Sequence, residues 1–567
     1  MKRKKKILFL QLPRLDHDVS DDHENLPDAF LYLDYAVRKS PEAAFYRTQW
    51  LEPQDRLDDT HLVRSILKIR PDVISCTLYL WNIERTIRVI QLVRKNHPAV
   101  FAIAGGPEVA RDNPILFKKP AFNAAVVGEG ESVLPILLRA LRRGTRPDLN
   151  TVAWRHGRRW TWGRREPPHE SLEKILPPPS WKKLAPDARG TAHLETTRGC
   201  PMRCTYCTYN QHRIGVSHLT TDQVLAYVTA LHRRGARFIR FIDPTFNSNP
   251  HFDGILAALA QWNRRHRLEF FAELRADRIT PEQARRLAAA HFTEVEVGVQ
   301  SHSEKVLQAI RRPLNFTAVD HGIRRLTAAG IRITLDLMYG LPRQSLSSLR
   351  QSVRWAAGRR GVRVQCLQTL VLPGTELRRT HRAQGIECLA MPPYSVQSTP
   401  DLNRTRMRDA EDIIEKTLKV SYDNPTRRFV GDNLPDLFRE RVRLSVDRPF
   451  SGRLSGRENR RALLLASADF FVRRARLEQI VHTALCNEPN VAWQFVLVLK
   501  REEPLDLLDF LVGIIQQYKP LPADYLLGAR YQGVTVSRRL FLLLAGAHRF
   551  SRSWKSAAED LLRSAFF

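Results

Sequence analysis

Three cysteines stand close together near the middle of the chain and could bind metal. Cys200, Cys204 and Cys207 form the pattern Cys-x3-Cys-x2-Cys. Cysteine thiolates hold iron–sulfur clusters, and a [4Fe–4S] cluster closed by protein takes four of them, so three ligands would leave one iron open. A structural zinc site needs a fourth cysteine or histidine at a matched spacing, and no such pair follows closely. The pattern therefore favours an iron–sulfur cluster over zinc.

A series of alternating strands and helices must position these cysteines. Strand-like segments are expected at residues 193–197, 238–243, 269–274, 294–298, 332–337 and 362–367, with helical stretches between them. Gly235, Gly330 and Gly361 stand just before three of these strands, where helices commonly end. Six such units over residues 190–400 predict a partial (β/α)6 barrel of the TIM type. Active sites in these barrels lie at the C-terminal ends of the strands, which is where the cysteines follow the first strand.

The first 145 residues predict a doubly wound, Rossmann-like α/β domain. Strands are expected at 7–12, 72–77, 100–104 and 124–127, and strands that alternate with helices form a parallel sheet. Ligands of such sheets bind at the carboxyl ends of the strands, which singles out the loops at 77–82, 105–108 and 128–131. The last two loops read Gly-Gly-Pro-Glu and Gly-Glu-Gly-Glu. No Gly-x-Gly-x-x-Gly fingerprint follows an early strand, so NAD is not expected.

The remaining segments carry no readable chemistry. Residues 146–189, rich in Arg, Trp and Pro, are predicted to be a linker between the two α/β domains. From residue 401 to residue 567, long amphipathic segments such as 461–476 and 505–518 predict a mainly α-helical C-terminal domain. Cys366, Cys388 and Cys486 are scattered and are expected to be buried small hydrophobic side chains.

The composition is that of a soluble globular protein with a basic surface. The 90 Lys and Arg residues outnumber the 59 Asp and Glu residues, for a net charge of +31, but they are dispersed along the chain without an RNA-binding motif. A nucleic-acid partner is therefore not expected from this pattern, and whether the charge recruits an acidic peptide stays open. No apolar run reaches the 18 residues of a membrane span. The basic N-terminus lacks a cleavage site, and seven cysteines form no disulfide framework, so a cytoplasmic location is expected.

The cysteine pattern at the end of a strand that opens a βα barrel resembles the radical S-adenosylmethionine (SAM) superfamily, in which SAM chelates the open iron. Further matches lie where that family's strands end, at residues 241–244, 273–275, 298–301 and 338–342. Barrel packing or turn capping is the alternative role for each matched residue. The residues that the resemblance places around SAM are Tyr206 near the adenine, Glu273 and Arg275 facing SAM, Asp243, and Gly298, Gln300 and Ser301 in the lining turn.

A doubly wound domain in front of such a barrel resembles the cobalamin-binding (B12) class of radical SAM enzymes, over residues 1 to about 400. The resemblance implies that glycines let the backbone approach the corrin or its nucleotide tail. The implied loop residues are Gly105, Gly106, Pro107 and Glu108, together with Gly128, Glu129 and Gly130. The family's Asp-x-His-x-x-Gly motif is incomplete, because Leu26 stands in the place of the glycine after His23. Cobalamin would then bind without a protein histidine, its lower face covered by the loop with Leu78, Trp81 and Asn82; Trp81 is the candidate cover, or else a core residue.

In this class, a reduced cluster cleaves SAM to methionine and a 5′-deoxyadenosyl radical, and methylcobalamin delivers a methyl group. The resemblance implies an enzyme that methylates an inert carbon, or phosphorus, of a small molecule or peptide, with an electron donor of the flavodoxin or ferredoxin type. The catalytic residues themselves cannot be named from the sequence. Two alternatives remain: a cobalamin-dependent ring contraction, cyclisation or rearrangement without methyl transfer, and a sensor of cobalamin or redox state without turnover. A methylthiotransferase acting on tRNA is rejected, because its N-terminal domain would carry three more cysteines and this one has only Cys76.

Overall fold

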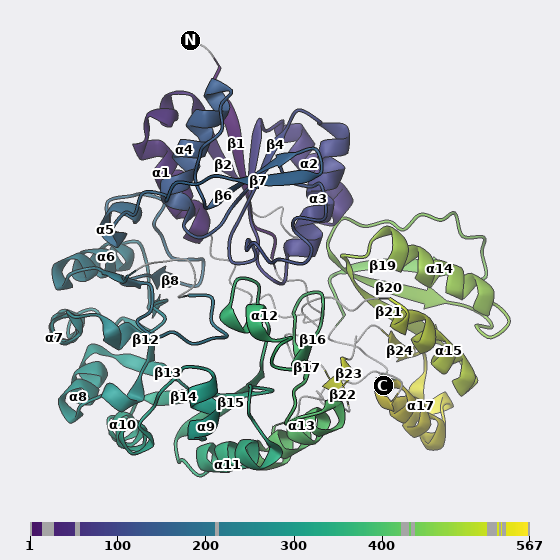
Figure 1. Ribbon diagram of the computed structural model, residues 1–567. Coiled ribbons are helices and arrows are strands. Elements are labelled where there is room, and N and C mark those ends of the chain that lie inside the picture. The colour runs from purple at the N-terminus through teal and green to yellow at the C-terminus, as the bar shows by residue number, and fades with distance from the viewer. Residues whose placement is uncertain are drawn as a thin grey trace.

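The computed structural model describes residues 3–13, 28–51, 57–209, 215–420, 430–431, 437–518, 530–531, 534–535 and 540–564. Three main sheets, of seven, six and five strands, each lie at the centre of one part of the chain. In Figure 1 the N-terminal sheet lies above the barrel, and the C-terminal sheet lies beside both. Within the described residues, no helix is long and apolar enough to cross a membrane.

The N-terminal domain is a doubly wound sheet, as predicted. Its strands are β1 (Lys5–Leu10), β2 (Tyr46–Trp50), β3 (Val73–Thr77), β4 (Phe101–Gly105), β5 (Ala124–Val126), β6 (Val152–His156) and β7 (Arg159–Trp162). Its helices are α1 (Asp28–Lys39), α2 (Asp59–Ile69), α3 (Ile83–Asn96) and α4 (Gly130–Arg143). The first five strands run parallel in the order β2-β1-β3-β4-β5. This order places the topological switch point, where such sheets bind ligands, between β1 and β3.

Two features of this domain differ from the prediction. Residues 152–162 are not linker: β6 and β7 form an antiparallel hairpin that extends the first sheet beyond β5. Trp160 and Trp162 of this hairpin pack on Phe117, which explains why the segment is rich in aromatic residues. The strand β2 was not predicted, because its residues alternate between buried and exposed over only five positions at the sheet edge.

The six predicted strands of the barrel are all present. They are β8 (Thr191–Leu194), β11 (Phe238–Phe241), β12 (Glu269–Leu274), β13 (Phe292–Gln300), β14 (Arg332–Tyr339) and β15 (Val362–Gln368). The strands run parallel in the order β15-β14-β13-β12-β11-β8, and no pairing between β8 and β15 occurs among the described residues. The barrel is therefore partial and open along one side.

Helices cover the outside of the barrel, as Figure 1 shows. They are α6 (Thr221–Arg233), α7 (Phe252–Asn263), α8 (Pro281–Ala290), α9 (Glu304–Ala309), α10 (Phe316–Ala328) and α11 (Leu346–Ala357). Local signals set their ends: Thr220 with Gln223, and Thr280 with Gln283, form capping boxes at the starts of α6 and α8. Alternate strand residues such as Phe270, Ala272 and Leu274 face these helices and form the core.

Short elements follow the last barrel strand and end the barrel domain. They are α12 (Glu376–Thr380), β16 (Glu387–Cys388), β17 (Val396–Ser398) and α13 (Arg404–Leu418). Met407, Ala410 and Ile414 of α13 belong to the same hydrophobic core as the barrel strands. The Tyr339 hydroxyl of β14 also donates a hydrogen bond to Glu411 at 2.7 Å. The barrel domain therefore extends to about residue 418 rather than to residue 400.

The prediction of a mainly helical C-terminal domain is wrong. The domain has a five-stranded sheet of β18 (Val430–Gly431), β24 (Leu540–Leu544), β21 (Ala492–Leu499), β20 (Arg460–Ala466) and β19 (Glu440–Ser445), all parallel. Its other elements are α14 (Arg474–Asn487), α15 (Leu505–Gln516), α17 (Arg552–Ser564) and the short pair β22 (Arg530–Tyr531) and β23 (Val534–Thr535). The central strands are apolar at nearly every position because both faces are covered, so they lack the alternation that marks a strand.

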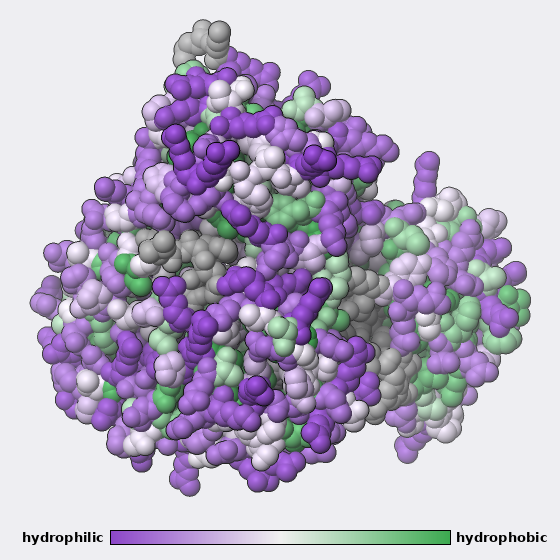
Figure 2. Space-filling view, in the orientation of Figure 1, coloured by the Kyte–Doolittle hydropathy of each residue, from purple (hydrophilic) through white to green (hydrophobic). Residues whose placement is uncertain are grey.

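The molecular surface is mostly hydrophilic on the face in view. Hydrophilic side chains cover most of the face in Figure 2 without gathering over one element. The remaining cysteines are mixed in their exposure: Cys366 is buried and Cys388 is half-buried, as a packing role requires, whereas Cys486 is exposed, against the expectation.

Candidate cofactor site between the barrel and the N-terminal sheet

The cysteine loop leaves the carboxyl end of β8 and is tied to the barrel at several points. The short strand β9 (Thr197–Arg198) pairs with β10 (Ser217–His218) just before the loop. Gly199 then takes a left-handed backbone with φ of 92°, which glycine adopts without strain. The Thr205 amide donates to the Ile310 carbonyl at 3.1 Å, and the Leu377 amide donates to the Thr205 carbonyl at 2.8 Å. The barrel thus holds the loop from both sides.

The three thiols of this loop lie near one another, and none of them forms a disulfide. Cys204 is buried, and Cys200 and Cys207 are half-buried. Burial, together with the charges of Cys204 and Cys200, raises the pKa of the Cys207 thiol to about 11. The Arg312 guanidinium donates to the Cys204 Sγ at 3.5 Å.

These thiols fit an iron–sulfur cluster better than a single metal ion. Among the described residues, no three His, Cys, Asp or Glu side chains converge on one point that could hold a metal ion. In a [4Fe–4S] cluster each thiolate binds a different iron, so cluster ligands surround a volume instead of meeting at a point. Iron would also hold the coordinating thiols in their deprotonated form, against the effect of burial.

Arg275 supports the cysteine loop. Its guanidinium forms an ion pair with Asp277 at 2.6 Å and donates to the Pro313 carbonyl at 3.0 Å. The same side chain reaches the Met202 Sδ, between Cys200 and Cys204, at 3.2 Å. The resemblance predicts that Arg275 faces SAM, which stays a prediction; its contacts in the structure hold the loop.

Asp243 and Ser301 are also engaged by protein. The buried Asp243 carboxylate accepts a hydrogen bond from the Thr196 amide at 2.6 Å, which ties the ends of β8 and β11 together. Burial raises the pKa of Asp243 to about 7. The Ser301 Oγ lies 3.4 Å from the Ser352 Oγ inside the core. Both residues lie at the predicted strand ends, and their contact with SAM stays a prediction.

Glu273, Tyr206 and the turn at Gly298 and Gln300 come together around Arg312, which the sequence alone did not single out. The Arg312 guanidinium donates to the Gly298 carbonyl at 2.6 Å while it contacts Cys204. Gln300 has a φ of 69°, an unusual left-handed backbone for a residue with a Cβ. Burial raises the pKa of Tyr206 beside the cysteines and raises that of Glu273 to about 7. Sequence reasoning could have noticed Arg312 only as one of many arginines.

The inner face of the barrel carries a row of carboxylates that the sequence analysis missed. Glu273 on β12 stands in register with Glu296 on β13, and Asp336 on β14 pairs with Gly298 one level further along β13. The Gln365 Nε2 donates to the Asp336 Oδ1 at 2.6 Å. Burial and the nearby Glu296 raise the pKa of Asp336 to about 8. The sequence could have indicated these carboxylates, because Glu and Asp stand at alternate positions of strands that are otherwise apolar.

The three predicted loops of the N-terminal domain lie together at the carboxyl edge of its sheet. They follow β3, β4 and β5, which are neighbouring parallel strands. Gly106 has a φ of 96°, and a Cβ there would lie 2.7 Å from the Leu78 carbonyl oxygen, so this glycine packs against the first loop. At Gly105, by contrast, the nearest atom to an added Cβ is 3.8 Å away. Gly128 is also left-handed, with a φ of 79°, just before Glu129 and Gly130 at the start of α4.

In the first of these loops, Trp81 stacks on a neighbouring ring, and the Asn82 side chain holds the backbone of the loop in place. Trp81 stacks on Tyr79 with ring centroids 4.4 Å apart and an angle of 6° between the planes. The buried Asn82 donates to the Leu12 carbonyl at 2.9 Å and accepts from the Tyr79 amide at 2.9 Å, so it closes the loop. Leu78 is fully buried. His23 of the incomplete Asp-x-His-x-x-Gly motif lies outside the described residues.

Glu108, at the end of the second loop, points toward the barrel domain. Its carboxylate accepts a hydrogen bond from the Tyr394 hydroxyl at 2.8 Å and another from the Asn113 Nδ2 at 3.1 Å. Burial raises the pKa of Glu108 to about 7. Contact of Glu108 with cobalamin stays a prediction, and in the structure its carboxylate links the two domains. The neighbouring Pro107 stays a prediction.

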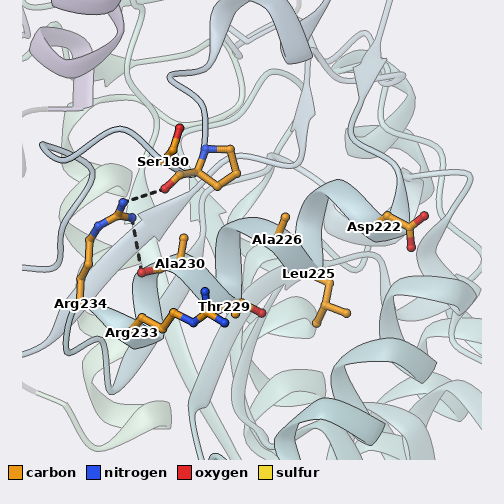
Figure 3. Close-up of a pocket in the computed structure, with 9 residues that line it drawn as sticks. Ser180, Asp222, Leu225, Ala226, Thr229, Ala230, Arg233 and Arg234 are labelled. Carbon is orange, nitrogen blue, oxygen red and sulfur yellow. Dashed lines mark hydrogen bonds between the residues drawn. The ribbon is translucent and has the colours of Figure 1, made fainter.

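A cavity of about 680 Å³ lies outside this site, along α6. Figure 3 shows its lining side chains on α6 and on the segment at Ser180, with Arg234 hydrogen-bonded to the Pro179 carbonyl at 2.8 Å and to the Ala230 carbonyl at 3.4 Å. The lining includes none of the predicted site residues, so this cavity is separate from the cysteine loop.

Comparison with known families matches both α/β domains. The family model of the B12 binding domain matches residues 37–138, and that of the radical SAM superfamily matches residues 194–356. The first match covers four of the five parallel strands of the N-terminal sheet, and the second covers β11 to β14 with the cysteine loop. These domains take cobalamin, a [4Fe–4S] cluster and SAM.

Two curated relatives resemble about half of the chain. The cobalamin-dependent radical SAM methyltransferase TokK of Streptomyces tokunonensis is 28% identical over 306 residues, which cover 50% of this chain and 44% of TokK. The 2-(S-pantetheinyl)-carbapenam-3-carboxylate methyltransferase of Streptantibioticus cattleyicolor is 27% identical over 306 residues, with the same coverage. The match thus spans less than half the length of either relative.

Two solved structures share the fold over more of the chain. The radical SAM methyltransferase TsrM from Kitasatospora setae, with cobalamin and a [4Fe–4S] cluster bound, has a TM-score of 0.53 and 15% identity, covering 69% of this chain and 82% of TsrM. The cobalamin-dependent SAM radical enzyme OxsB, with aqua-cobalamin and SAM bound, has a TM-score of 0.56 and 15% identity, covering 72% of this chain and 66% of OxsB. The chain therefore carries a B12 binding domain followed by a radical SAM domain, and the loop with three thiols lies inside the second match.

Proposed function

We propose that this protein transfers a methyl group from SAM, by way of cobalamin, to an unactivated carbon of a small molecule or a peptide. The observation that carries the proposal is an ion pair between the two cofactor loops. The Arg198 guanidinium, two positions before Cys200, donates to the Glu131 carboxylate at 2.9 Å, and Glu131 ends the Gly-Glu-Gly-Glu loop of the N-terminal domain. We call the carboxyl edge of the N-terminal sheet, with the loops at 77–82, 105–108 and 128–131, the cobalamin edge. The ion pair joins this edge to the cysteine loop, as methyl transfer between the two cofactors requires. Both relatives named above are methyltransferases.

The residues of this chain would bind and orient the cofactors. When bound, the cluster and SAM supply a carbon radical by one-electron reduction, and cobalamin carries the methyl group. Cys200, Cys204 and Cys207 would hold the cluster, and Arg312 would offset the negative charge of its thiolates. Trp81 would cover the lower face of cobalamin. The carboxylates inside the barrel would meet the polar groups of SAM or substrate.

The glutamate of the barrel wall and the neighbouring turn would line the SAM site. Glu273 is buried beside Arg312, and the Gly298 carbonyl accepts from the same guanidinium. We assign Glu273, Tyr206, Gly298 and Gln300 to contact with SAM. An electron donor of the flavodoxin or ferredoxin type would reduce the cluster, because the reaction needs one electron for each SAM that is cleaved.

The test is product analysis with SAM under anaerobic conditions. Protein reconstituted with iron, sulfide and hydroxocobalamin is incubated with SAM and titanium(III) citrate as the reductant, and the Cys200→Ala/Cys204→Ala/Cys207→Ala variant serves as the control. Methyl transfer predicts S-adenosylhomocysteine as well as 5′-deoxyadenosine. A wild-type protein that forms 5′-deoxyadenosine alone would overturn the methyl-transfer proposal and favour a rearrangement.

A further inference from the structure

Both glycine loops at the cobalamin edge end in a glutamate, and both glutamates bind the barrel domain. Glu108 ends Gly-Gly-Pro-Glu and accepts from the Tyr394 hydroxyl, 286 positions later in the chain. Glu131 ends Gly-Glu-Gly-Glu and accepts from Arg198. In each loop the glycines lie at the ligand edge of the sheet while the glutamate turns to the other domain. In both loops, therefore, the glycines are placed to face the ligand and the glutamate contacts the barrel domain.

The first contact is fully enclosed. Tyr394 is 0% exposed and Glu108 is 2% exposed. The Asn113 amide holds the Glu108 carboxylate from the N-terminal side, and the Asp112 carboxylate accepts from the Gly374 amide of the barrel domain at 2.7 Å nearby. A buried hydrogen bond with supported partners fixes the separation of the two backbones that carry it.

The second contact reaches the cysteine loop directly. Arg198 also donates to both Glu195 oxygens, at 2.9 and 2.7 Å, so its guanidinium is held in a fixed orientation. The Arg198 and Glu131 side chains are 13% and 11% exposed. The Arg198 guanidinium further lies over the Tyr32 ring of α1, 5.6 Å from its centroid. A shift of the N-terminal domain would break the contacts of Arg198 with Glu131 and with Tyr32 at once.

We infer that Glu131 with Arg198, and Glu108 with Tyr394, are positioning pairs that set the separation between the cobalamin and the cluster-bound SAM. This inference rests on the proposed function. Cleavage of SAM at the cluster needs only the barrel, whereas movement of the SAM methyl group to cobalamin needs both domains in register. Loss of the pairs should uncouple these two reactions.

The experiment compares Glu131→Ala, Glu131→Gln and Tyr394→Phe with the wild type, each reconstituted with cluster and hydroxocobalamin. Titanium(III) citrate reduces cobalamin to cob(I)alamin, whose electron pair takes the methyl group of added SAM as the sulfur–carbon bond breaks, leaving S-adenosylhomocysteine. We expect this methyl transfer to fall at least tenfold in Glu131→Ala and about fivefold in Tyr394→Phe. Formation of 5′-deoxyadenosine should stay within twofold, and Glu131→Gln, which keeps an acceptor for Arg198, should recover part of the loss.

A spectroscopic measurement reports the separation without turnover. Pulsed electron paramagnetic resonance of the cob(II)alamin and reduced-cluster spins, without SAM, should give a broader distribution of distances in Glu131→Ala and Tyr394→Phe. Tyr227→Phe is the matched control, because the Tyr227 hydroxyl is also buried but donates to the Pro177 carbonyl at 2.9 Å and not to a residue of the N-terminal domain.

The outcomes separate this inference from the proposed function. Unchanged methyl transfer and an unchanged distance distribution in the variants would overturn the inference. So would loss of cobalamin itself from Glu131→Ala, since the glutamate would then bind the cofactor. A wild-type protein that forms no methylcobalamin would reject the proposed function, and the distance measurement would still test the positioning pairs.

Discussion

Arg461 of the C-terminal domain forms a buried ion pair with Asp58 of the N-terminal domain, although 403 positions separate the two residues. Neither side chain is more than 2% exposed. Arg461 also pairs with Glu440 at 3.1 Å and with Glu488 at 2.7 Å, so three carboxylates surround one guanidinium. Asp58 in turn caps α2, where its side chain accepts from the His61 amide. The C-terminal sheet is thus anchored to a helix of the cobalamin-binding domain.

Removal of this guanidinium should loosen the C-terminal domain. Arg461→Ala leaves Asp58, Glu440 and Glu488 without their shared cation, and breaking a buried pair in this way costs about 3–5 kcal/mol. We expect a lower urea midpoint and faster cleavage of the segment before β19 by a low concentration of trypsin. Arg453→Ala, at an exposed position of the same domain, is the control. An unchanged midpoint would contradict the anchoring role.

Replacement of the three loop cysteines should remove iron and spare cobalamin. The Cys200→Ala/Cys204→Ala/Cys207→Ala variant is expected to fall from about four irons per chain to less than one after reconstitution, because three thiolates hold the cluster. Cobalt per chain should stay at about one, since the cobalamin edge lies on the other domain. Iron and cobalt are counted by mass spectrometry, and Cys486→Ser, at an exposed cysteine outside the site, should keep its iron.

Alanine should lower folding stability at Gly106 but should affect only cobalamin binding at Gly105. Gly106→Ala forces a left-handed residue and places a Cβ 2.7 Å from the Leu78 carbonyl oxygen, so it should cost at least about 2 kcal/mol of folding free energy. Gly105→Ala meets no atom closer than 3.8 Å and should leave the melting temperature nearly unchanged. If cobalamin approaches the backbone at Gly105, this second variant should still weaken hydroxocobalamin binding about tenfold. Equal binding by Gly105→Ala and wild type would place the corrin elsewhere.

Trp81 should contribute to cobalamin affinity through its ring. Loss of an aromatic face removes about 1–2 kcal/mol of apolar contact, so Trp81→Ala should bind hydroxocobalamin about 5- to 30-fold more weakly. Trp81→Phe keeps a ring that can stack on Tyr79 and should retain most of the affinity. Binding is followed by the absorbance of the corrin. Wild-type affinity in both variants would mean that Trp81 is only a packing residue.

The predicted and the observed structures agree where local pattern decides the fold. The barrel strands were predictable from short apolar runs, which alternate with polar residues in β13, and β12 has the predicted bounds. The C-terminal strands were not, because the Leu-Leu-Leu core of β20 is equally compatible with a buried helix. Arg312 and Arg461 could not be found either, since each takes its role from partners distant in the chain. The cysteine motif needed no such partners.

Burial of Glu108 should make stability depend on pH. Its pKa lies near 7 in the folded protein and near 4.5 when unfolded, so the folded state binds the proton more tightly, and stability falls as the pH rises from about 4.5 to 7. Glu108→Gln removes a cost of about 3 kcal/mol while its amide oxygen still accepts from Tyr394. The melting temperature of the variant minus that of the wild type should therefore increase across this window. Parallel curves would show that Glu108 stays charged or exposed.

Three contacts between the domains are made by carboxylates, and this affects the N-terminal domain while the rest of the chain is being synthesised. Glu108, Glu131 and Asp58 of the N-terminal domain find their partners at Tyr394, Arg198 and Arg461. Until the ribosome has delivered those partners, the three carboxylates are hydrated by water. An apolar docking surface would stay sticky during the same interval and invite aggregation. At these three sites the newly made N-terminal domain therefore exposes hydrated charge, whereas Leu31 and Tyr32 of α1 stay uncovered until the barrel core forms around them.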